Sequence, residues 1–144
     1  MPGTDPIVMQ ASVVVIGGRA LAIEGPPGSG KSSLALALID RGAQLIGDDA
    51  VTLSRQKERV IAAPPPNIAG LLELRGIGLE RFACAEPAPL ALVLSLGDTG
   101  ERLPDRAGTR TILGLAVPWI AFEPGVIAPA VRAEYALRRF GLAD

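Results

Sequence analysis

The 144-residue chain has no histidine, a single cysteine and few aromatic residues. The lack of histidine excludes imidazole general bases, Ser-His-Asp triads and histidine metal ligands. Because Cys84 is alone, it cannot form an intramolecular disulfide. Any acid–base chemistry therefore depends on carboxylates, lysine or water.

Charge of one sign and long apolar runs are also lacking. With 14 basic and 15 acidic residues the net charge is −1, so we expect no general attraction to nucleic acid or to an anionic membrane. The apolar runs 90–96 and 112–122 are too short for a membrane span or are interrupted by Gly114 and Pro118. The first residues also lack the basic and apolar regions of an export signal, so we expect a cytoplasmic protein without a membrane segment.

The length predicts one domain over residues 1–144, in which about two-thirds of the unfolded surface becomes buried. Hydrophobic residues make up 49 % of the chain and aromatics 3 %, so its core must consist of Ala, Leu, Val and Ile. The pattern predicts a hairpin over 13–23, helices over 31–40 and 129–140, and strands at 45–46, 51–53, 59–61, 71–74, 90–96 and 119–122. This order indicates an α/β fold with a mixed β-sheet flanked by helices.

A glycine-rich loop is the most informative motif. Residues 25–32, GPPGSGKS, fit G-x-x-x-x-G-K-[ST] between a predicted strand and a predicted helix. In such a loop, backbone N–H groups and the helix N-terminus face a polyphosphate, the lysine reaches the β- and γ-phosphates, and the hydroxyl binds Mg²⁺. The predicted nucleotide-binding residues are Gly25, Pro26, Pro27, Gly28, Ser29, Gly30, Lys31, Ser32 and Ser33. The alternative, a turn that binds nothing, leaves Lys31 without a role.

Two acidic residues follow the next predicted strand, at the edge of the sheet where ligands bind in α/β folds. Because neighbouring strand residues point to opposite faces, Asp48 and Asp49 are expected to have different roles, one towards metal and one towards the acceptor. A simple acidic turn is the alternative. Glu73 interrupts an apolar run, and either Mg²⁺ or a salt bridge to Arg75 would compensate its burial.

Three arginines lie in a polar segment over 98–110 that we expect to be exposed and mobile. Arg102, Arg106 and Arg110 are candidates for stabilising transition-state charge, with solvated surface arginines as the alternative.

Three elements follow one another along the chain: the glycine-rich loop, Asp48-Asp49-Ala50-Val51 and Glu73-Leu74-Arg75-Gly76-Ile77-Gly78. In this order and spacing they make the chain resemble the catalytic domain of HPr kinase/phosphorylase over most of its length. That family phosphorylates a serine of HPr, a phosphocarrier of the sugar phosphotransferase system, with ATP or pyrophosphate, and can reverse the reaction with inorganic phosphate. The resemblance implies a fold similar to phosphoenolpyruvate carboxykinase around the P-loop.

The resemblance also implies residue roles. Asp49 would accept the proton of the substrate serine, Ser32 and Glu73 would bind Mg²⁺ beside the further candidate Asp48, Lys31 would bind the phosphates, and Arg106 would match an arginine of the mobile loop. The implied function is an ATP-dependent serine kinase of an HPr-like phosphocarrier.

Departures from the family qualify this prediction. No separate N-terminal domain precedes the loop region, so the resemblance implies a truncated, catalytic-domain-only member. Gln10 stands where the family has a histidine, and Val126 where it has the arginine of Pro-Gly-Arg-Asn, a segment linked to dephosphorylation. We therefore expect weak or absent phosphorylase activity.

The residues leave two other functions open: a non-catalytic nucleotide-sensing module and a small-metabolite P-loop kinase. The family forms homo-oligomers, and whether this chain does so stays open.

Overall fold

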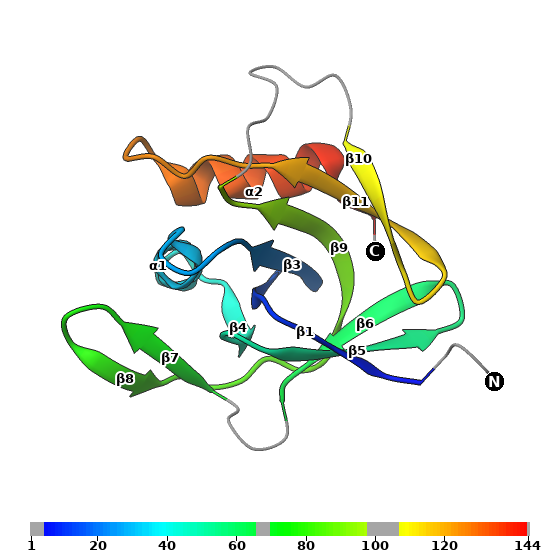
Figure 1. Ribbon diagram of the computed structural model, residues 1–144, viewed down its shortest axis with the longest axis horizontal. Helices are drawn as coiled ribbons and strands as arrows, with labels where there is room; N and C mark the ends of the chain where they lie inside the picture. Colours follow the sequence, from blue (N-terminus) through cyan, green and yellow to red (C-terminus); the bar gives the residue numbers. More distant parts are fainter. Residues whose placement is uncertain (1–4, 66–69, 98–106, 144) are drawn as a thin grey trace.

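The computed structural model describes residues 5–65, 70–97 and 107–143. These residues form a curled mixed β-sheet and two helices, with a separate two-stranded hairpin beside them (Figure 1). The strands are β1 (Ile7–Met9), β2 (Ser12–Ile16), β3 (Arg19–Glu24), β4 (Gln44–Gly47), β5 (Val51–Gln56), β6 (Arg59–Ala63), β7 (Leu71–Leu74), β8 (Gly78–Arg81), β9 (Ala88–Ser95), β10 (Gly108–Ile112) and β11 (Leu115–Ala121), and the helices are α1 (Lys31–Asp40) and α2 (Pro129–Phe140).

The sheet is centred on β9, which the apolar run of residues 90–96 predicts as a strand buried on both faces. On one side, β9 pairs in parallel with β3. On the other side, the start of β9 pairs with β6 in the antiparallel direction, and the end of β9 pairs with β11 in parallel. The order β1-β5-β6-β9-β3-β2-β4 follows across the sheet, and β10 pairs with β11. Because β3, β9 and β11 are parallel, their carboxyl ends meet at one edge.

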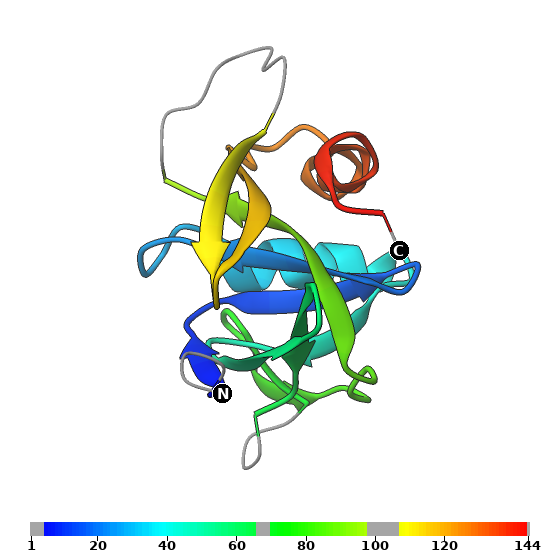
Figure 2. The ribbon, with the colours of Figure 1, turned by 90° about the vertical axis from the view of Figure 1, so that its right-hand side faces the viewer.

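Both helices pack on the same face of the sheet (Figure 2). Buried side chains of α1 and α2 share one core with Leu21, Ile23, Leu92 and other residues of the central strands. The predicted mixed sheet with helices packed on it is confirmed, and both helices lie on one face. The second core, which includes Ala22, Val93 and Val117, is closed by the curl of the sheet itself, because β5, β6, β10 and β11 turn over it.

The helices were well predicted. Both have the bounds that the sequence predicts, and α2 begins with a proline and buries Ala130, Ala133 and Leu137. Arg41 after α1 forms a 2.9 Å salt bridge with Glu134 of α2, and this hydrogen bond raises the pKa of the Arg41 guanidinium. Neither helix in the described ranges is long and apolar enough to span a membrane.

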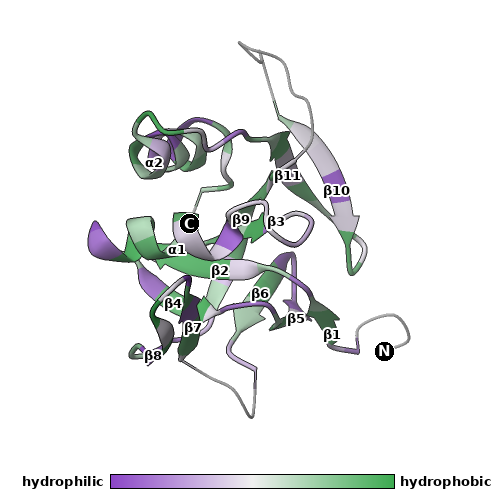
Figure 3. Cartoon of the chain, turned by 60° about the vertical axis from the view of Figure 1, so that its left-hand side comes forward, coloured by the Kyte–Doolittle hydropathy of each residue, from purple (hydrophilic) through white to green (hydrophobic). Residues whose placement is uncertain are grey.

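Three strands were not predicted: β1, β8 and β10. All three are short and largely exposed. β8 and β10 lack the apolar runs that mark a strand in the sequence, and β1 is an apolar run of only three residues. In Figure 3, β2 is mostly hydrophobic in colour, whereas β10 is pale with a hydrophilic band. The expectation of a mobile segment up to Arg110 is therefore wrong for residues 108–110, which belong to β10.

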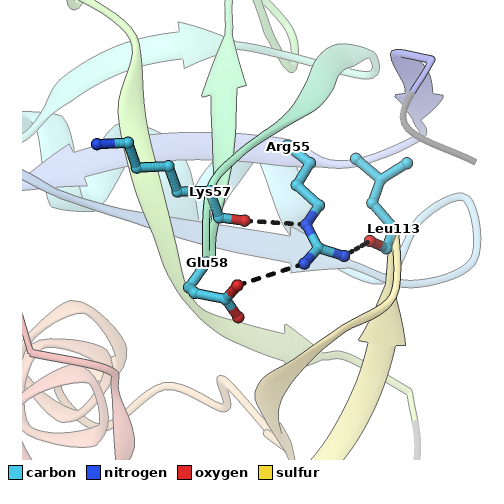
Figure 4. Close-up of polar contacts among 4 residues, drawn as sticks. All are labelled: Arg55, Lys57, Glu58 and Leu113. Atoms are coloured by element: carbon cyan, nitrogen blue, oxygen red, sulfur yellow. Dashed lines mark hydrogen bonds and ion pairs between the residues drawn. The ribbon is translucent and has the colours of Figure 1, made fainter. Parts of the chain in front are cut away.

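At the amino end of β11, one arginine connects two hairpin turns (Figure 4). Arg55 donates from Nε to the Lys57 carbonyl oxygen at 2.9 Å and from Nη1 to that of Leu113 at 3.1 Å, and it lies 3.5 Å from Glu58. Lys57 and Leu113 have positive φ angles of 57° and 53°, which non-glycine residues rarely adopt. Arg55 thus binds the β5–β6 turn to the β10–β11 turn, far from the glycine-rich loop.

Candidate active site

The glycine-rich loop runs from the carboxyl end of β3 to the start of α1, as predicted. Its last residue, Gly30, is the N-cap of α1 with φ 100°, and no side chain caps the helix or places an acid in its first turn. The backbone N–H groups of that turn and the helix dipole are therefore free for an anion. Lys31 extends back over the loop, with Nζ donating to the Gly25 carbonyl oxygen at 2.7 Å.

Glycine is required where the loop starts. A Cβ on Gly25 would lie 2.7 Å from Ser29 Oγ and 2.9 Å from the Leu96 carbonyl oxygen, which are impossible contacts. In contrast, Gly28 has φ +80° and nothing within 4 Å of a Cβ position, so it faces open space. Ser29 Oγ is buried without a hydrogen-bond partner among the described residues. The loop is therefore tightly packed against the protein at Gly25 and open to solvent at Gly28.

Asp48 connects the loop to the rest of the site. Its Oδ1 accepts hydrogen bonds from Ser32 Oγ at 2.8 Å and from Ser12 Oγ at 2.6 Å. Its Oδ2 faces the backbone N–H of Glu73 at 3.5 Å. Asp48 therefore lies directly beside the predicted metal-binding hydroxyl, with its orientation set by strands β2 and β7.

Asp49 differs from its neighbour in its surroundings. Both aspartates follow the end of β4, so strand alternation, on which the prediction of different roles was based, does not apply to them. Asp49 is exposed, and its φ of 73° places it in the left-handed region, which Asp tolerates better than most residues. Within the described part of the chain its carboxylate has no hydrogen-bond or salt-bridge partner. Asp49 is thus a free carboxylate at the entrance of the site, while Asp48 is bound inside it.

Glu73 is placed differently from the expectation. The sequence suggests a carboxylate in a buried strand, but Glu73 is exposed, because β7 pairs only with β8 in the separate hairpin. The structure contains no Glu73–Arg75 salt bridge, so that alternative is wrong. Its side chain faces the cavity described next.

A cavity of about 850 Å³ brings most of the predicted residues together. Its walls are residues 27–33 of the loop and α1, residues 48–49, and residues 71 and 73–79 of the β7–β8 hairpin. This volume lies within the range of ligand sites in proteins. Gly25 and Pro26 lie outside the wall: Gly25 is underneath the loop, and Pro26 packs against Gly97.

The donors in this cavity suit magnesium bound together with phosphate. Among the described residues no group of three or more acidic or cysteine side chains could hold a metal alone. Mg²⁺ typically takes one or two carboxylates and completes its shell with water and substrate phosphates. Ser32, Asp48 and Glu73 offer oxygen ligands of this kind around one cavity, so the donor set fits.

Of the three arginines predicted to stabilise transition-state charge, one lies within the described residues. Arg102 and Arg106 lie outside the described residues. Arg110 is in β10 and forms a salt bridge with Glu24, the residue just before the loop. It also lies over the Trp119 ring, 6.0 Å from the centroid, so it is a partnered strand residue and not a mobile one.

Two residues near the site were missed. Ser12 is fully buried and reaches Asp48 from 36 positions away, and a lone serine at the start of an apolar run gives only a weak signal for that. Arg132 binds the segment before α2, and helical spacing predicts only that it lies towards solvent.

Comparisons with known proteins identify sequences similar to this chain. The family model "HPr Serine kinase C-terminal domain" matches residues 4–83, more than half of the chain. The chain is 35 % identical over 125 residues to an HPr kinase/phosphorylase of Lacticaseibacillus casei, covering 78 % of this chain and 39 % of that protein. It is 39 % identical over 113 residues to one of Bordetella pertussis, covering 69 % of this chain and 37 % of that protein. The chain thus spans about two-fifths of the length of these curated relatives.

A solved structure has the same fold. The Hpr(Ser) kinase/phosphatase from Coxiella burnetii superposes with a TM-score of 0.79 at 30 % sequence identity, covering 92 % of this chain and 94 % of that one. The curled mixed sheet with two helices is therefore an arrangement that this relative shares.

Proposed function

The chain belongs to the HPr serine kinase C-terminal domain family, and on that premise we propose that it is an ATP-dependent protein serine kinase acting on an HPr-like phosphocarrier. The observation that carries the proposal is the pairing of Ser32 with Asp48 beside the open loop, next to the free carboxylate of Asp49. A kinase needs this combination of phosphate cradle, metal ligands and proton acceptor in one cavity.

In the proposed roles, the loop amides and Lys31 bind the polyphosphate, and Ser32, Asp48 and Glu73 hold Mg²⁺. The metal, when bound, would neutralise charge on the transferred phosphoryl group. Lys31 Nζ would exchange the neutral Gly25 carbonyl oxygen for negatively charged phosphate oxygens, so that both partners of the hydrogen bond are charged. The buried hydrogen bond from Ser12 would fix the rotamer of Asp48.

Asp49 is the proposed proton acceptor. As the serine oxygen bonds to the γ-phosphorus and the bond to the leaving ADP oxygen breaks, the hydroxyl proton passes to the Asp49 carboxylate. An exposed carboxylate without a partner suits this role, because its acceptor atoms stay available. Arg106 keeps its predicted role in transition-state charge, and the phosphoenolpyruvate carboxykinase-like fold also stays a prediction.

The direct test is phosphoserine formation. Purified protein with Mg-ATP and a panel of HPr-like phosphocarriers is expected to yield phosphoserine on at least one of them, measured by mass spectrometry. Binding of nucleotide with no phosphoserine on any carrier would instead support a sensing module. The same phosphorylated carrier, incubated with inorganic phosphate, tests the proposed weakness of the reverse reaction: rapid dephosphorylation would contradict it.

A further inference from the structure

Arg132 of α2 makes an unusual number of contacts with one short segment. Its Nε donates to the Ile127 carbonyl oxygen at 3.0 Å, and its Nη2 donates to the carbonyl oxygens of Glu123, at 3.0 Å, and Pro124. The guanidinium also lies over the ring of Phe122, 5.1 Å from the centroid. A single side chain therefore binds the backbone of residues 123–127 at three points.

The segment has little else to fix its shape. Val126 and Ile127 are 96 % and 77 % exposed, so apolar burial does not hold it. Ala128 has a positive φ of 43° and no side chain caps α2 there. Phe122 is buried and donates its N–H to the Ser95 carbonyl oxygen. For residues 123–127, the described side-chain restraint is the set of carbonyl contacts with Arg132.

This restrained segment adjoins the glycine-rich loop. A Cβ added to Gly30 would lie 4.0 Å from Pro124 Cγ, so the proline ring lies beside the N-cap residue of α1. Gly30 in turn accepts the hydrogen bond of Leu34 N–H at 2.9 Å, the first of the helix. The start of α1, whose residues 30–33 line the cavity, therefore lies next to a segment that Arg132 holds.

We propose that Arg132 is a positioning residue of the nucleotide site, acting through Pro124 on Gly30 and the first turn of α1. The inference rests on the proposed nucleotide binding. It adds Arg132, which lies outside the cavity, to the residues that determine the affinity for Mg-ATP. Arg132 is not among the residues that line the cavity, so its proposed effect passes through the segment. Without it, the three carbonyl oxygens would turn to water, and the proline would no longer restrict Gly30.

Calorimetric Kd values for Mg-ATP test the proposal in wild type, Arg132→Ala, Pro124→Ala and the double variant. Each single variant is expected to bind about tenfold more weakly, about 1.4 kcal/mol. The double variant should bind no more weakly than the singles, because both changes break one connection. Arg132→Lys should recover part of the affinity, since one donor remains near the carbonyls.

Arg55→Ala is the matched control, because Arg55 also binds loop carbonyls but at the other end of the sheet. It should keep the wild-type Kd. Wild-type Kd values in both single variants, or losses that add in the double variant, would overturn the positioning role. Lower melting temperatures with unchanged Kd would overturn it too, since they indicate a purely structural arginine.

The two proposals fail separately. A folded wild type that gives no heat with Mg-ATP refutes the proposed function and this inference with it. A wild type that binds while the variants bind equally well refutes only the inference. If Arg132→Ala does not fold, Pro124→Ala, which keeps the arginine, decides the matter.

Discussion

At each end of the parallel strands an arginine binds the carbonyl oxygens of a neighbouring turn. Arg132 does so after the carboxyl end of β11 and Arg55 before its amino end, and both turns contain a non-glycine residue with positive φ. The difference lies in what surrounds them. The segment that Arg132 holds lies next to the start of α1, whose first residues line a cavity with two aspartates, whereas Arg55 connects two hairpin turns.

This comparison shows which features of the two ends of the sheet are shared and which are found only beside the candidate site. The same guanidinium–carbonyl contacts occur at both ends, so they do not identify a site by themselves. The carboxyl edge is the candidate site because α1 starts there with free N–H groups and two aspartates follow the end of β4 there. The predictions below compare substitutions at this edge with matched ones elsewhere.

The largest expected effect is on catalysis by Asp49→Asn. Loss of the proposed proton acceptor should lower kcat about 10²–10⁴-fold, while the Kd for Mg-ATP stays near wild type, because the proposed partner of Asp49 is the acceptor serine and not the nucleotide. Steady-state phosphorylation of the carrier and calorimetry measure the two quantities. Asp40→Asn, an exposed aspartate at the far end of α1, is the control. Equal losses of rate and affinity in Asp49→Asn would contradict its role.

The chain's two lysines provide the next comparison, because one lies at each end of the sheet. Lys31→Ala should weaken Mg-ATP binding roughly 10–100-fold, since hydrogen bonds to charged groups contribute about 1.5–3 kcal/mol. Lys57→Ala, in the β5–β6 turn, should leave the Kd unchanged. Similar Kd values for the two variants would mean that the loop lysine does not bind phosphate.

A smaller effect is expected from Ser12→Ala. Removing a fully buried donor to Asp48 should lower the free energy of unfolding by about 1 kcal/mol. The binding free energy of ATP in magnesium should also become weaker by about 1 kcal/mol. The reason is that the Asp48 carboxylate loses the hydrogen bond that orients it. Denaturant unfolding and calorimetry check both, with Ser54→Ala in β5 as the control. An unchanged Mg²⁺ dependence would remove Ser12 from the site.

The smallest expected effect on the site belongs to Arg55→Ala. It should reduce the free energy of unfolding by about 1 kcal/mol, through the lost contacts with two turns, and leave carrier phosphorylation unaltered. Chemical denaturation and the phosphorylation assay measure this. A clear loss of activity would show that the two ends of the sheet are coupled.

The sequence predicted those parts of the fold that local patterns determine. Helix α1 follows from the loop and the apolar residues after it, α2 from Pro129 and its spacing, and β9 from a run bounded by proline and glycine. It did not predict β10, because Arg110 and its neighbours look like a loop until pairing with β11 is known. Nor did it predict the exposure of Glu73, which depends on β7 leaving the main sheet.

The site shows the same division. The loop and the pair of aspartates are each a run of neighbouring residues, so the sequence alone identifies them. The Ser12–Asp48 bond joins residues 36 apart, and the Arg132 contacts depend on the path of the chain after β11, so both required coordinates.

Titration calorimetry of the folded protein with ATP, in magnesium and again in excess EDTA, tests the central claim most directly. A loop that holds a triphosphate and a metal shared by Ser32 and Asp48 predicts saturable heat with magnesium and much weaker binding without it. No heat in either buffer, or equal affinity in both, would contradict the account.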